Sequence, residues 1–186
     1  ETALALFSAL LDGLGTAHRL GFVHRDLKPS NILLDLRPGR LQPRIADFGL
    51  VKTADQDLTV TGAVFGTPAY AAPEQLRDAS QADALSDLFS MGVIFAELLT
   101  GRRPFAGTSI VAVYEAHKAP PDLDGIAPRL QSLIRALLSI APEHRPPSAA
   151  AVSERLGAIS GEPLATGGVL WAAADALRRS RSAAPA

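Results

Sequence analysis

The chain has 186 residues, which suits one domain with a sizeable hydrophobic core. Apolar residues make up 47% of the chain, which argues against disorder, and a formal net charge of −1 gives no electrostatic case for nucleic acid or an anionic membrane as a partner. The absence of cysteine excludes a disulfide framework and thiolate chemistry, which fits a reducing compartment, and no apolar run approaches the ~20 residues that a membrane helix needs.

The first predicted element is an amphipathic helix over residues 2 to 19. Apolar residues recur there at steps of three and four, and Gly21 follows the last turn. We interpret His18, near the end of this helix, as a helix-terminal or surface histidine. Two short strands are expected next, at 31–34 and 44–46, because the turn-forming run Arg37-Pro38-Gly39 separates them.

Two polar motifs flank this predicted hairpin. The run His24-Arg25-Asp26-Leu27-Lys28-Pro29-Ser30-Asn31 fits the pattern H-R-D-x-x-x-x-N, and Asp47-Phe48-Gly49 follows it as D-F-G. Four fixed letters match by chance about once in 10⁵ start positions, which disfavours an ordinary polar surface loop. The hairpin would carry Asn31 and Asp47 side by side.

The residue types in these motifs suit phosphoryl transfer. A carboxylate at Asp26 can orient a hydroxyl nucleophile and take its proton, and Lys28 can place a positive charge near a phosphate. Asn31 and Asp47 offer oxygen atoms, which are the ligands that Mg²⁺ prefers.

The middle of the chain combines a loop with a buried helix. Residues 50 to 71 lack helical periodicity, which predicts a loop, and a short helix is expected at 74–78 behind Pro73. The segment from 86 to 99 is apolar on nearly every side, which predicts a buried helix with Ser86 as its N-cap and Gly101 as its stop.

Three further helices are predicted at 109–118, 128–140 and 148–159, joined by proline-rich turns. Ala141 precedes a proline without a side chain that can cap, so a minor loss of capping is expected there. From Gly161 onward the composition shifts, and residues 167–179 could form one amphipathic helix containing Trp171, which we expect to dock a helix.

The motifs resemble those of protein kinases. Ala72-Pro73-Glu74 is similar to the A-P-E element that closes the activation segment, and the run from 66 to 75 is similar to the eukaryotic-like serine/threonine kinases of bacteria. Lys28-Pro29 after Asp26 is typical of the Ser/Thr branch. The resemblance covers about residues 1–158 and leaves 159–186 as a tail or linker.

The resemblance implies a mainly α fold: a kinase C-terminal lobe with a small β-hairpin at the catalytic loop, and with the N-lobe absent. The catalytic loop would span 24–31 and the activation segment 47–74. It also implies ATP and Mg²⁺ as cofactors and proteins with Ser or Thr acceptors as substrates. Lys28 would lie near the transferred phosphate of ATP.

The resemblance assigns further roles outside the two motifs. Thr67 would face the catalytic residues and favour Ser/Thr acceptors, and phosphate on Thr59 or Thr61 would pair with Arg25 and order the loop. Asp87 would anchor the backbone of the catalytic loop, with an ordinary helix N-terminal carboxylate as the alternative. Glu74 would form a buried ion pair with Arg145.

No glycine-rich G-x-G-x-x-G loop and no V-A-I-K lysine occur in the sequence, and the chain begins at Glu1 inside a helical pattern. We therefore expect a cytoplasmic fragment that has no membrane segment of its own and is inactive without the missing lobe. A membrane-anchored full-length protein, with this fragment in its cytoplasmic part, is the alternative to a wholly cytoplasmic one. A pseudokinase that docks partners without catalysis is the alternative. The intact motif residues favour the enzyme, and an unrelated small helical domain does not account for the joint motif match.

Overall fold

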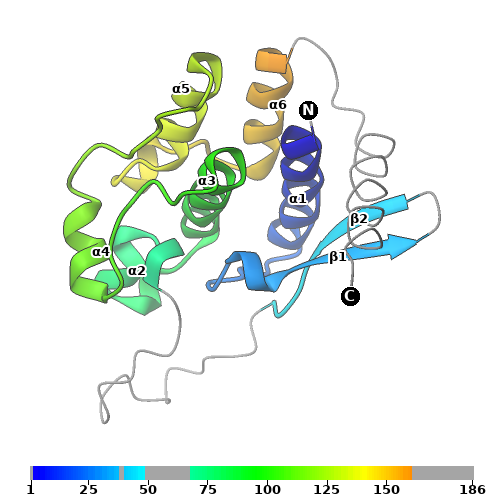
Figure 1. The fold of residues 1–186 in the computed structure, drawn as a ribbon. Coiled ribbons are helices and arrows are strands. Elements are labelled where there is room, and N and C mark those ends of the chain that lie inside the picture. The colour runs from blue at the N-terminus through cyan, green and yellow to red at the C-terminus, as the bar shows by residue number, and fades with distance from the viewer. Residues whose placement is uncertain (1, 38–39, 49–67, 161–186) are drawn as a thin grey trace, which may run out of the picture.

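A computed structural model describes residues 2–37, 40–48 and 68–160 of the chain. As the sequence predicted, these residues are mainly helical and contain a small antiparallel hairpin (Figure 1). The helices and strands are α1 (Thr2–Arg19), β1 (Ile32–Arg37), β2 (Arg40–Ile45), α2 (Pro73–Arg77), α3 (Ala84–Thr100), α4 (Ile110–Ala116), α5 (Pro128–Leu137) and α6 (Ala149–Ser160). Short 3₁₀ turns are η1 (Pro29–Asn31), η2 (Pro68–Tyr70), η3 (Ala79–Gln81) and η4 (Pro142–His144). No helix among the described residues has the length and apolar character to cross a bilayer.

Helix α3 is the centre of the hydrophobic core, and every residue from 86 to 96 in it is buried. It begins earlier than predicted: the N-cap is Asp83, whose carboxylate accepts hydrogen bonds from the backbone of Leu85 and Ser86. The expectation of a Ser86 N-cap was wrong, because Ser86 is the third residue of the helix. Its hydroxyl accepts a hydrogen bond from Asp83 N at 3.3 Å, closing a capping box, and donates to Glu74 Oε1 at 2.7 Å. Gly101 ends the helix in the left-handed region, with φ 72°, as predicted.

Helices α1 and α5 pack on α3, and α6 packs on α1 and α5 (Figure 1). The Phe7 ring of α1 stacks on Phe95 of α3, with centroids 3.9 Å apart. Gly92 lets α5 approach closely, because an added Cβ would lie 2.8 Å from Leu137 Cβ. The core therefore fixes the orientation of the long helices relative to one another.

The hairpin packs on α1 through β2. Its register pairs Ile32 with Ile45 and Arg37 with Arg40, so both strands are longer than predicted. The prediction ended the first strand before Asp35 and began the second after Pro43, but an antiparallel hairpin with one solvated face tolerates polar side chains.

A buried ion pair joins α2 to the chain that follows η4. Arg145 donates through Nη1 and Nη2 to the two carboxylate oxygens of Glu74, at 2.6 and 2.8 Å. Burial alone would raise the pKa of Glu74, but hydrogen bonds from Arg145 and Ser86 outweigh burial and lower it. Ala141 has no side-chain capping bond at the start of η4, and the turn forms without one.

The core also contains a histidine, His117, whose ring makes no hydrogen bond within the described part of the chain. His117 is 3% exposed, and neither of its ring nitrogens has a hydrogen-bond partner among the described residues. Its ring lies edge-on to those of Phe89 and Phe105, with centroids 5.1 and 4.6 Å away. Burial lowers the pKa of His117 to about 4, while the charges of Glu74 and Arg145 act in opposite directions.

The Glu74–Arg145 pair can be tested by removing one partner. Arg145→Met leaves the Glu74 carboxylate buried without its cation, and we expect the free energy of unfolding to fall by about 3–5 kcal/mol in denaturant titrations. Arg102→Met is the control, because its ion pair with Asp122 is exposed and should contribute about 1 kcal/mol or less. Similar losses for both variants would contradict the structural role of the buried pair.

The buried His117 predicts acid sensitivity. Between pH 6.5 and about 4 the unfolded chain binds a proton on His117 that the folded chain does not, so the free energy of unfolding falls as the pH drops through this window. The loss should reach about 3 kcal/mol, measured as unfolding free energy against pH. His117→Leu should flatten this dependence, whereas the same change at exposed His144 should not. An unchanged pH dependence in His117→Leu would refute the assignment.

Candidate active site

The site is built on the loop between α1 and β1, and its backbone is held by one carboxylate from α3. Asp87, in the first turn of α3, accepts a hydrogen bond from His24 N through Oδ2 and from Arg25 N through Oδ1, both at 2.8 Å. The Asp87 side chain is 1% exposed. Asp87 therefore contacts the loop backbone, as the sequence interpretation expected. The two N–H groups also supply the hydrogen-bond donors that a buried carboxylate requires.

His18 is a member of this arrangement that the sequence interpretation missed. It lies in the last turn of α1, as expected, but it is not a surface residue: its side chain is 11% exposed and Nε2 lies 2.8 Å from Asp87 Oδ2. Its only sequence signal was its place on the inner side of an amphipathic helix, and its partner is 69 residues away.

The ring of His24 connects the loop to the end of β2. Because Asp26 N can only donate, His24 Nδ1 accepts its hydrogen bond, at 3.3 Å, and Nε2 then donates to Ala46 O at 2.8 Å. The ring also lies edge-on to Phe48, with centroids 5.0 Å apart. His24 therefore holds the residues before Asp26 against the residues around Asp47.

Three of the predicted site residues meet directly in this loop. Lys28 Nζ lies 2.8 Å from Asp26 Oδ2, and the Asp26 side chain is 50% exposed. Asn31, in η1, is buried and donates from Nδ2 to Asp26 O at 2.8 Å. The Asp26 carboxylate thus faces solvent, while the Asn31 amide that supports its backbone is buried.

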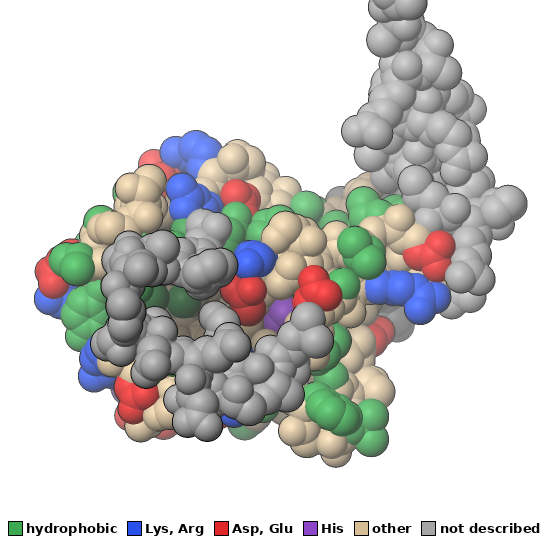
Figure 2. All heavy atoms as spheres, turned by 90° about the horizontal axis from the view of Figure 1, so that it is seen from below, with side chains coloured by type: hydrophobic (Ala, Val, Ile, Leu, Met, Phe, Trp, Pro, Cys, Tyr) green, Lys and Arg blue, Asp and Glu red, His purple; other side chains and the backbone are tan. Residues whose placement is uncertain are grey.

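The hairpin brings Asp47 beside this cluster. Ala46 N donates to Asn31 O at 2.8 Å, so Asp47 follows directly after the residue that pairs with Asn31. Asp47 itself is exposed and has φ 59°, a left-handed conformation that turns the chain away from the strand. On the face shown in Figure 2, acidic and basic side chains lie next to one another around a histidine.

Three of the predicted residues cannot be placed. Thr59, Thr61 and Thr67 lie outside the described residues. Arg25, the partner expected for a phosphate on Thr59 or Thr61, has an exposed side chain.

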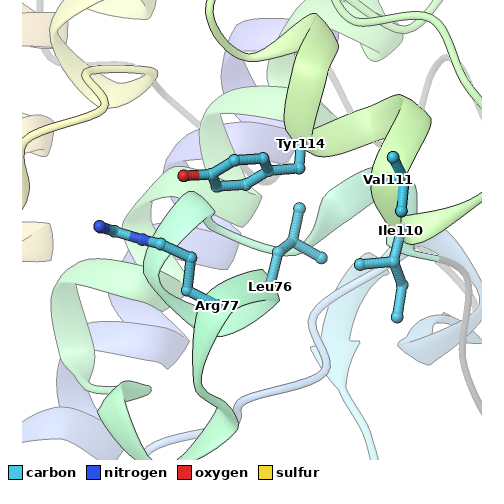
Figure 3. A pocket seen from close by; sticks show the side chains of 5 residues that line it. All are labelled: Leu76, Arg77, Ile110, Val111 and Tyr114. Atoms are coloured by element: carbon cyan, nitrogen blue, oxygen red, sulfur yellow. The ribbon is translucent and has the colours of Figure 1, made fainter.

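A shallow apolar pocket of about 200 Å³ lies between α2 and α4. Figure 3 shows its lining, with two side chains from one helix facing three from the other. The lining residues are Leu76, Arg77, Ile110, Val111 and Tyr114. None of the predicted site residues belongs to this lining, so the pocket is separate from the polar cluster.

Comparison with known proteins agrees with this geometry. The model of the protein kinase domain matches residues 1–156. The chain is 40% identical to serine/threonine-protein kinase PknL of Mycobacterium tuberculosis over 169 residues, which are 87% of this chain and 41% of PknL. It is 39% identical to serine/threonine-protein kinase pkn3 of Myxococcus xanthus, covering 84% of this chain and 31% of that protein.

The chain thus spans about two fifths or less of the length of these relatives. The matched region includes the catalytic loop, the hairpin, α2 and the ion pair between Glu74 and Arg145. The chain therefore belongs to the protein kinase family, in its eukaryotic-like bacterial serine/threonine branch.

Proposed function

We propose that the protein containing this chain transfers the γ-phosphate of ATP to Ser or Thr residues of protein substrates. The observation that carries the proposal is the polar cluster in which the Asp26 carboxylate lies 2.8 Å from the Lys28 ammonium group, beside the paired backbones of Asn31 and Ala46. Family membership supports the reaction class, and the cluster supplies residues suited to each part of it.

In this proposal, Asp26 orients the acceptor hydroxyl and takes its proton. The half-exposed carboxylate suits this role, because a protein substrate must reach it from solvent. Lys28, already beside Asp26, would offset negative charge on the transferred phosphoryl group.

Asn31 and Asp47 are the residues that would hold Mg²⁺. The amide nitrogen of Asn31 donates a hydrogen bond to the Asp26 carbonyl, so its amide oxygen would be available to a metal ion. Asp47 would add an exposed carboxylate. Within the described part of the chain no three acidic, histidine or cysteine side chains form a metal cluster. One carboxylate and one amide oxygen suit an ion that takes its other ligands from phosphate and water. Bound ATP·Mg²⁺ would supply the phosphoryl group and neutralise its charge.

The loop threonines extend the proposal on the strength of the sequence alone. Thr67 would contribute to the preference for Ser and Thr acceptors. A phosphate on Thr59 or Thr61 would order the activation segment by pairing with Arg25, whose exposed side chain leaves it accessible to such a group.

We further propose that residues 1–158 act as the C-lobe of the kinase and residues 159–186 as a tail or linker, and that the protein works in the cytoplasm. The 186 residues contain no glycine-rich loop and no V-A-I-K lysine, so the chain by itself would lack groups that hold the nucleotide. We therefore expect no phosphate transfer by this chain alone.

The proposal is tested by radiolabelled transfer from ATP·Mg²⁺ to a generic Ser/Thr substrate, with the complete gene product that contains this chain. Asp26→Asn should lower kcat by about 10²–10⁴-fold, because the amide cannot take the proton. Asp12→Asn, an exposed acid-to-amide change on α1, is the control and should retain wild-type activity.

Wild-type transfer that survives Asp26→Asn would overturn the role of Asp26. If neither the wild-type gene product nor a variant with acidic replacements at Thr59 and Thr61 transfers phosphate, the protein is instead a docking module with a kinase fold.

A further inference from the structure

The peptide bond that leads into Asp26 is held from two sides. Its N–H, on Asp26, donates to His24 Nδ1 at 3.3 Å, and its carbonyl, on Arg25, accepts a hydrogen bond from Gln75 Nε2 at 2.9 Å. Arg25 has φ 68°, a left-handed conformation that costs a non-glycine residue on the order of 1 kcal/mol. External contacts therefore have to hold this conformation.

Gln75 is well placed to supply one of these contacts. Its Oε1 accepts a hydrogen bond from Ala72 N at 3.1 Å, so both ends of the amide are occupied. The opposite orientation of the amide would set its oxygen against the Arg25 carbonyl and its nitrogen against the Ala72 N–H. The two partners therefore fix which atom faces the catalytic loop.

The helix that carries Gln75 is itself anchored to the core. Its neighbour Glu74 is bound by Arg145 through both carboxylate oxygens and by the Ser86 hydroxyl. Ser86 stands next to Asp87, the residue that holds the other side of the loop. Gln75 thus reaches Arg25 from a firmly held position 50 residues further along the chain.

We propose that Gln75 is a positioning residue for Asp26: its Nε2 hydrogen bond to the Arg25 carbonyl sets the direction in which the Asp26 carboxylate faces the acceptor hydroxyl. The inference rests on the proposed kinase activity. It also makes α2, at the end of the activation segment, a direct support of the catalytic loop.

A purely local role for Gln75 can be separated from this one. As the third residue of α2 it closes a capping interaction with the Ala72 N–H, which needs only an oxygen atom. Glutamate serves that interaction as well as glutamine does. Only the contact with Arg25 requires the amide nitrogen, because a carboxylate oxygen would face the carbonyl oxygen without a proton between them.

The test therefore uses Gln75→Glu and Gln75→Ala in the complete gene product, with steady-state kinetics and thermal unfolding. Both variants should lower kcat by about 10- to 100-fold, with the KM for ATP within about twofold of wild type. Gln131→Glu is the matched control, because Gln131 Nε2 also donates to a backbone carbonyl, Ile126 O, at 3.0 Å but far along the chain from the catalytic loop. It should keep the wild-type kcat whatever it does to the Tm.

Four outcomes are informative. A low kcat in Gln75→Glu, with a Tm no lower than that of Gln131→Glu, supports the positioning role. A wild-type kcat in Gln75→Glu overturns the positioning role and leaves the proposed function intact. An equal loss of kcat in Gln75→Glu and Gln131→Glu has the same meaning. A wild-type protein that transfers no phosphate defeats the proposed function, and this inference with it.

Discussion

The catalytic loop depends on one buried carboxylate. Asp87 projects from the first turn of α3 and is met by two backbone N–H groups, of His24 and Arg25, and by the ring of His18. A carboxylate taken out of water needs such donors, and a loop with a left-handed Arg25 needs an external hold. The same hydrogen bonds meet both requirements: they give Asp87 its donors and hold the loop backbone in place. The loop conformation and the burial of Asp87 therefore depend on each other.

The same turn of α3 also contacts α2. Ser86, adjacent to Asp87, donates to Glu74, and Arg145 completes the ion pair from the other side. Removing Glu74 or Arg145 would leave the other charge buried without its ionic partner, which is strongly destabilising. The first turn of α3 is thus the junction at which the loop of Asp26 and helix α2 are held relative to each other.

Around the hairpin, the side chains that support the backbone are buried, whereas the two candidate carboxylates are exposed. Its backbone pairing places Asn31 beside Ala46, and His24 spans from the loop to the same Ala46 carbonyl. These supporting groups are buried or partly buried, whereas the Asp26 carboxylate is half exposed and Asp47 is exposed. The arrangement leaves both carboxylates accessible from solvent, while the backbones of this site are fixed by contacts inside the protein.

The sequence by itself determined the family, the two motifs and the existence of the helices, because helical periodicity, a stop glycine such as Gly101 and fixed motif spacing are local properties. It did not determine the cap of α3 or the partners of His18 and Gln75. Asp83 and Ser86 are both good capping residues. In the folded protein Asp83 is the N-cap, and Ser86, as the third helical residue, bonds to both the Asp83 backbone and Glu74. His18 and Gln75 reach partners 69 and 50 residues away, so only the packing of α1, α2 and α3 could decide these contacts.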